Sequence, residues 1–129
     1  MTAADLDRIE KSLGVVLPAR YRATMLAYPF QPDHEAALGC MPDDADFVLE
    51  QNNAARPGPP HGRWPTEFVV IGTDGSEELF VLDGRTDNAP VFVFDLETGE
   101  LRPLAADFDA WLAQLREWQR AADEAAERE

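Results

Sequence analysis

Three short runs of β-branched and aromatic residues, separated by turn dipeptides, constrain most strongly how this chain can fold. Such runs predict strands, and the Asp-Gly pairs between them and the Thr-Gly pair after the last favour tight reversals of direction. We therefore expect an antiparallel meander. The runs are continuous rather than alternating, so both faces of the sheet should be covered to some extent, one by helices and the other with a partner as a candidate. The runs are residues 68–71, 79–82 and 91–94, with turns at Asp74-Gly75, Asp83-Gly84 and Thr98-Gly99.

Two helical patterns precede these strands. Thr2 and Asp5 form a capping-box-like start for the first, and Gly14 is its expected stop. A second helix is predicted from about residue 18 to 28, with Pro18 at its first helical position and Pro29 as its end. Apolar residues recur at helical spacing in both: Leu6, Ile9 and Leu13 in the first, and Tyr21, Met25 and Tyr28 in the second.

A third helix is predicted from Phe47 to Ala54, with Asp43 and Asp44 as candidate N-cap residues, although Val48-Leu49 interrupts its period. The segment that follows, residues 56–62, holds three prolines and two glycines in seven residues. Proline removes a backbone donor and glycine adds conformational freedom, so this composition excludes a helix or an inner strand. It predicts a surface loop inside one domain.

The last helix is expected to begin after Asp107, a good N-cap residue. Beyond Trp118 only alanines interrupt the charges, so residues 120–129 should form an exposed helical tail. A chain of 129 residues is long enough to bury one core without disulfides or metals. The sequence thus predicts a single α+β domain over residues 1–129, an antiparallel meander packed by N-terminal and C-terminal helices. One apolar stripe marks the last helix: Phe108, Trp111, Leu112, Leu115 and Trp118.

Acidic residues dominate the charge. The chain holds 25 Asp and Glu against 11 Lys and Arg, a net charge of −14. Residues 33–109 contain 17 of the acids and four arginines, so the acidity belongs to the middle of the fold. A field of that sign repels phosphate backbones and anionic lipid, and it attracts cationic partners. Direct binding to nucleic acid or membranes is disfavoured, whereas solubility and recognition of a basic partner both remain open explanations.

The cellular setting is also suggested by composition. The N-terminus has no basic start followed by an apolar run, and no stretch of about 18 apolar residues occurs. Cys40 is the single cysteine, so an internal disulfide is impossible. We expect a reducing, cytoplasmic location.

None of the short motifs predicts catalysis, and neither a cofactor nor a metal site is expected. His34-Glu35 begins like a zinc-protease motif but lacks the second histidine four residues later. Cys40, close to Leu38 and Met41, resembles a small core residue more than an activated thiol. Gly72 and Gly75 lack the lysine of a phosphate loop and are interpreted as turn glycines with positive φ.

The acidic clusters around residues 43–46 and 74–78 do not have the spacing of a calcium loop. They are solvated turns or, alternatively, parts of a partner-binding surface. Trp64 follows the proline-rich segment and either plugs it onto the core or presents an interface ring, the plug being favoured. The residues that we predict to bind a partner are Asp43, Asp44, Asp46, Glu50, Trp64, Asp74, Glu77, Glu78 and Asp87.

Taken in order, several short motifs make the chain resemble the SUKH superfamily. This superfamily takes in yeast cell-wall-assembly regulators and many bacterial immunity proteins. The chain departs from the family pattern at Glu77, where a glycine commonly stands, and in its proline-rich loop. The matching motifs are Ile9 and Leu13-Gly14 before Leu17-Pro18-x-x-Tyr21, Ile71-Gly72-x-Asp74-Gly75 followed by Phe80, Pro90-Val91-x-x-Phe94-Asp95, and Phe108-x-x-Trp111-Leu112.

The resemblance implies a sheet packed by helices, no catalytic residues and a surface that binds another protein. It further implies an immunity protein that neutralises a secreted or contact-dependent bacterial toxin, often a nuclease, whose basic cleft would attract an acidic partner. The alternative is an intracellular regulatory scaffold or adaptor of the same fold with a non-toxin partner. A small hydrolase that uses carboxylates is a third class, for which the sequence offers no signature.

Overall fold

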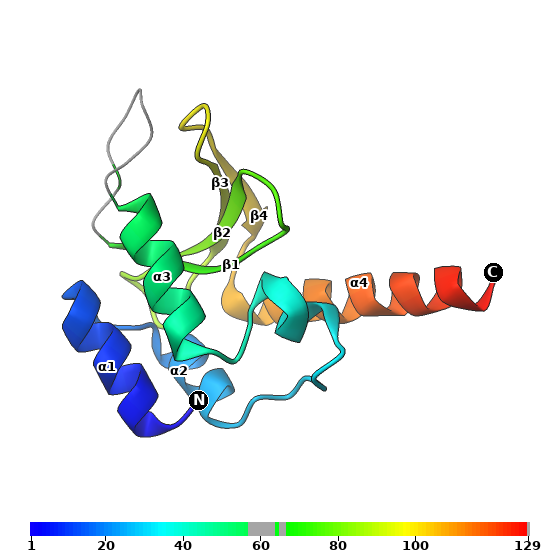
Figure 1. The fold of residues 1–129 in the computed structure, drawn as a ribbon, viewed down its shortest axis with the longest axis horizontal. Helices are drawn as coiled ribbons and strands as arrows, with labels where there is room; N and C mark the ends of the chain where they lie inside the picture. The colour runs from blue at the N-terminus through cyan, green and yellow to red at the C-terminus, as the bar shows by residue number, and fades with distance from the viewer. Residues whose placement is uncertain (57–63, 65–66, 129) are drawn as a thin grey trace.

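The computed structural model describes residues 1–56, 64 and 67–128. In this part of the chain, four antiparallel strands form one meander in the order β1-β2-β3-β4, with helices before and after it (Figure 1). The predicted α+β architecture is confirmed. Its elements are α1 (Ala3–Leu13), α2 (Ala19–Leu26), the π-helix η1 (Ala36–Cys40), α3 (Ala45–Ala55), β1 (Phe68–Thr73), β2 (Glu78–Asp83), β3 (Val91–Asp95), β4 (Leu101–Ala105) and α4 (Phe108–Glu127).

The N-terminal helices follow the local signals closely. The hydroxyl of Thr2 accepts from the amide of Asp5 and the Asp5 carboxylate accepts from the amide of Thr2, which completes the capping box. Gly14 ends α1 with φ at 67°. Pro18 is the N-cap residue of α2 rather than its first helical residue, and α2 ends at Leu26, two residues earlier than predicted.

Helix α3 begins at Ala45, directly after the candidate cap Asp44, whose carboxylate accepts from the amides of Asp46 and Phe47 at 3.0 and 3.2 Å. Asp44 is thus the N-cap residue, and Asp43 is not. The proline-rich segment after α3 lies, apart from Arg56, outside the described residues.

The core has two layers, one on each face of the sheet. The larger cluster joins α1, α2 and α4 to β1 and β2 through fully buried side chains such as Leu6, Tyr21, Ile71 and Trp111. The smaller cluster lies on the opposite face and is closed by Trp64, which is 7% exposed. The second face is therefore covered in part by the chain's own tryptophan.

Strand β4 is the one element of the sheet that the sequence patterns do not predict. It pairs with β3 at the edge of the meander and has Pro103 in its middle, where one side of the strand needs no ladder partner. Helix α4 then starts at the predicted cap, because the amide of Ala110 donates to the Asp107 carboxylate at 2.8 Å. Its C-terminal half projects away from the sheet (Figure 1).

Candidate functional site

The short π-helix η1 lies directly against β1, and Gly72 makes this approach possible. A Cβ atom at Gly72 would lie 1.8 Å from the carbonyl oxygen of Cys40, so no other residue fits without moving the backbone. Gly75 has the positive φ of 92° expected of a turn glycine, whereas Gly72 does not. Our interpretation of Gly72 as a turn glycine is therefore wrong: it is needed for close packing of two backbones.

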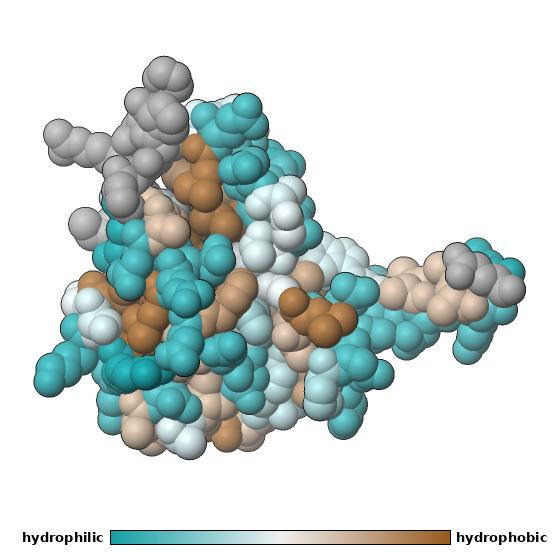
Figure 2. All heavy atoms as spheres, in the orientation of Figure 1, coloured by the Kyte–Doolittle hydropathy of each residue, from teal (hydrophilic) through white to brown (hydrophobic). Residues whose placement is uncertain are grey.

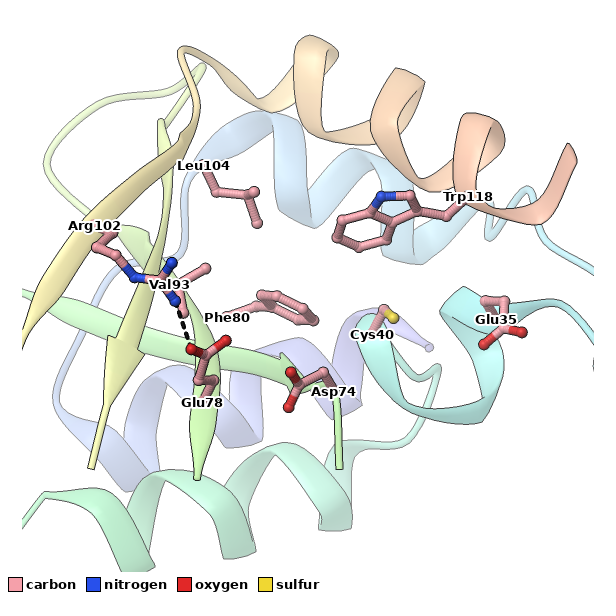
Figure 3. A pocket seen from close by; sticks show the side chains of 9 residues that line it. All are labelled: Glu35, Cys40, Asp74, Glu78, Phe80, Val93, Arg102, Leu104 and Trp118. Carbon is pink, nitrogen blue, oxygen red and sulfur yellow. Dashed lines mark hydrogen bonds and ion pairs between the residues drawn. The ribbon is translucent and has the colours of Figure 1, made fainter. Parts of the chain in front are cut away.

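A cavity of about 440 Å³ opens beside this contact, between η1, the sheet and α4. In Figure 3, Trp118 points from α4 toward Phe80 of β2, and the two rings lie 5.9 Å apart. Carboxylates stand around these apolar groups. The lining residues are Glu35, Cys40, Asp74, Glu78, Phe80, Val93, Arg102, Leu104 and Trp118.

The charges around the cavity do not balance. Among the described residues that line it, Arg102 is the one base, and its guanidinium binds the Glu78 carboxylate at 2.5 Å (Figure 3). The Asp74 carboxylate accepts from the amide and hydroxyl of Ser76, at 2.9 and 2.5 Å. Neither Glu35 nor Asp74 forms an ion pair with any residue that the structure describes. The cavity therefore carries negative charge over an apolar floor.

These surroundings change the pKa of the Cys40 thiol. Burial, followed by the negative charges of Glu35 and Asp74, raises its pKa from 9.0 to about 11. A nucleophilic thiol needs a lowered pKa instead. His34 offers no activation, because its Nδ1 atom accepts from the amide of Ala36 at 2.9 Å. Cys40 acts as a wall of the cavity.

A protein-family model matches most of the chain. The model of the SMI1 / KNR4 family (SUKH-1) matches residues 1–114, from the N-terminus into α4. The chain belongs to this family. The resemblance to the SUKH superfamily is confirmed, and membership of SUKH-1 is consistent with a non-enzymatic protein that binds another protein. Neither a curated protein nor a solved structure matches the chain.

Two negative findings concern the described residues of this SUKH-1 protein. No helix among residues 1–56 and 67–128 is long and apolar enough to cross a membrane. Within the same part of the chain, no group of three or more His, Cys, Asp or Glu residues is arranged to hold a metal ion.

The predicted partner-binding residues do not form one group. Asp74 and Glu78 meet at the cavity, whereas Asp43 and Asp44 line a second hollow of about 400 Å³ with Tyr28 and Phe30. Asp43 forms an ion pair with the amino group of Met1. Because Asp43 forms this ion pair and Asp44 caps α3, both carboxylates stabilise this SUKH-1 fold.

The other predicted acids are more available. Asp46 is 77% exposed and binds Arg8 at 2.7 Å. The remaining three are exposed and form no ion pair with a described residue: Glu50 on α3, Glu77 in the β1–β2 turn and Asp87 in the β2–β3 connection.

Trp64, also predicted to bind a partner, is buried in the structure. Its indole N–H donates to the carbonyl of Phe68 at 3.3 Å, and its ring packs edge-on against Phe94 with centroids 4.9 Å apart. Only 7% of the residue is exposed. The plug interpretation is therefore the one that the geometry favours over the interface ring.

Of the nine described residues that line the cavity, sequence reasoning assigned seven to no site: Glu35, Cys40, Phe80, Val93, Arg102, Leu104 and Trp118. Glu35 and Trp118 lie far apart in the chain, and Arg102 and Leu104 belong to the strand that was not predicted. One signal links the first two segments in space: the amide of Glu35 donates to the side chain of Gln119 at 2.9 Å, across 84 positions. No local pattern in the sequence reports such a contact.

Proposed function

We propose that this protein is a non-enzymatic immunity protein that binds and neutralises a cognate secreted or contact-dependent bacterial toxin in the cytoplasm. Its acidic surface would recognise a basic toxin domain, with a nuclease as the type that best fits the charge. The SUKH-1 membership supports a protein-binding role and is consistent with immunity.

The observation that carries this proposal is the unneutralised acidity of the surface. Of the 24 acids among the described residues, 14 form no ion pair with a described residue, although the chain offers 11 bases in all. Toxins that grip nucleic acid present clefts of the opposite charge, so a protein with a net charge of −14 would be steered toward them. Five exposed members of this set are Glu35, Glu50, Asp74, Glu77 and Asp87.

Charge alone rarely supplies affinity, so the proposal also needs an apolar contact. Leu38 on η1 is 69% exposed, and its neighbours Glu35 and Cys40 line the cavity together with the Phe80 and Trp118 rings. Figure 2 shows a small apolar patch over η1, bordered by hydrophilic atoms. An apolar centre with a charged rim is the usual anatomy of a protein interface.

The direct test is co-expression with the secreted protein encoded beside this chain, with host survival and co-purification as the measurements. Rescue together with a stable complex is the expected result. Unchanged toxicity without a complex would overturn the immunity role and favour a regulatory scaffold with a non-toxin partner.

A charge-reversed variant tests the electrostatic part. Glu50→Lys, Glu77→Lys and Asp87→Lys together change exposed side chains that have no ion pair among the described residues, so folding should be kept. Association with the toxin should slow about tenfold at low salt, and the difference should shrink as salt rises. Equal rates for the variant and the parent chain would show that these acids do not steer the partner.

A further inference from the structure

The cavity between η1, β2 and α4 combines an apolar floor with an acidic rim. Its floor is apolar and aromatic, formed by Phe80, Val93, Leu104 and the half-buried Trp118. Its rim holds three carboxylates against one guanidinium. Its volume of about 440 Å³ falls in the range of pockets that enclose a ligand group.

The chemistry of this lining selects among cationic groups. A metal ion prefers a cluster of oxygen ligands, and no such cluster occurs among the described residues. A lysine ammonium is a compact, strongly hydrated charge that gains little from an aromatic floor. A guanidinium is planar and weakly hydrated, stacks on a tryptophan ring and binds carboxylates through two parallel hydrogen bonds.

The cavity already shows one contact of this type. Arg102 of β4 binds Glu78 of β2 at one end, which satisfies that carboxylate internally (Figure 3). Glu35 and Asp74 line the rest of the rim without a basic partner among the described residues. Their negative charges can therefore be partly neutralised by one further guanidinium. The Trp118 ring provides a surface on which that guanidinium can stack.

We propose that this cavity receives one arginine side chain of the protein partner, with its guanidinium on Trp118 and bound to Glu35 and Asp74. This inference rests on the proposed function for the identity of the partner. It assigns the centre of the interface to the η1–α4 side of the molecule. The acids on α3 and on the β2–β3 connection then serve long-range attraction rather than contact at the centre.

The cavity is tested first with a defined probe, the peptide acetyl-Gly-Arg-Gly-amide, titrated into the intact protein and followed by amide and indole resonances in nuclear magnetic resonance spectra. Two matched peptides carry lysine or neutral citrulline in place of arginine. The arginine peptide should shift the Trp118 indole and the amides of Glu35, Cys40 and Asp74. It should bind about tenfold more tightly than the citrulline peptide and more tightly than the lysine peptide.

The double variant Glu35→Gln and Asp74→Asn keeps the shape of both side chains and should weaken arginine binding about tenfold. Asp46→Asn with Glu50→Gln removes the same net charge on α3 and is the matched control, which should bind almost as the parent chain. Trp118→Leu tests the ring separately. Unchanged thermal midpoints and circular dichroism spectra of the two charge variants establish that each is folded.

Two results would overturn this inference. One is a citrulline peptide that binds as well as the arginine peptide, and the other is an equal loss of arginine binding in the cavity variant and in the α3 control. Either would leave the immunity role intact, because that role is judged by toxin rescue. Failure of rescue with cavity binding retained would instead remove the toxin as partner. With a rescued toxin in hand, the cavity variant should lose at least tenfold more affinity for it than the α3 control does.

Discussion

The side-chain amide of Asn52 bonds both backbone groups of Val70, as a neighbouring strand would do. Its Oδ1 atom accepts from the Val70 amide at 2.8 Å, and its Nδ2 atom donates to the Val70 carbonyl at 2.9 Å and to the Val48 carbonyl at 2.7 Å. Asn52 is fully buried, and β1 is an edge strand of the sheet. Helix α3 thereby closes one sheet edge through a single polar residue.

Replacing Asn52 by leucine should destabilise the fold by about 3 kcal/mol, because two buried backbone groups of Val70 lose their partners. Chemical denaturation measures this free energy of unfolding. Asn53→Leu is the matched control, since Asn53 is exposed on the same helix and should change stability by less than about 0.5 kcal/mol. Similar losses in the two variants would contradict the edge-closing role.

Gly72→Ala should destabilise the protein by about 3 kcal/mol, since the added methyl group meets the backbone of Cys40 and η1 has to move. Gly75→Ala should lower the stability by only about 1–2 kcal/mol. A Cβ atom there has no neighbour within 4 Å, so the positive φ is the one source of strain. Denaturation of the two variants compares the effects. A Gly72→Ala protein as stable as Gly75→Ala would show that η1 does not depend on this contact.

The Cys40 thiol should stay protonated in the folded protein up to a pH near its raised pKa of about 11. The folded pKa lies above the ordinary value of 9.0, so this group stabilises the fold below pH 9 and the stabilisation is lost as the pH rises toward 11. The rate of alkylation against pH, compared with the unfolded chain, measures the shift. An inflection at the ordinary value would refute it.

Neutralising the two cavity acids should lower the Cys40 pKa, since Glu35 and Asp74 are the second and third causes of its rise after burial. Glu35→Gln with Asp74→Asn should therefore move the alkylation profile to lower pH without restoring the ordinary value. Asp46→Asn with Glu50→Gln should leave the profile in place. Identical profiles for all three proteins would place the two carboxylates too far from the thiol to act on it.

Asp107→Ala should destabilise the fold by about 1 kcal/mol, because the Ala110 amide at the start of α4 loses its acceptor. Asp107→Asn keeps an acceptor oxygen and should recover most of the loss. Thermal unfolding of both variants provides the comparison. The side chain of Asn88 also accepts from the Phe108 amide at 3.0 Å, so α4 should still form in the alanine variant.

The sequence by itself determined the elements whose signals are local. The capping box of Thr2 and Asp5, the N-caps Asp44 and Asp107, and the strands between Asp-Gly turns all depend on residues within a few positions of one another. Their physical causes, hydrogen bonds to free helix amides and side-chain periodicity, are therefore visible in the chain itself. The excess of negative charge is also a property of composition, and so it needed no coordinates.

Only the tertiary structure decided what those elements assemble. The cavity joins Glu35 to Trp118, and Asn52 replaces a strand partner of Val70, through contacts that leave no periodic trace in the sequence. Gly72 shows most clearly what local sequence patterns fail to predict. A glycine in a turn motif predicts positive φ, yet its role depends on a carbonyl group 32 residues away, at Cys40. Close approach between distant segments is set by packing of the whole core, and local residue patterns do not contain it.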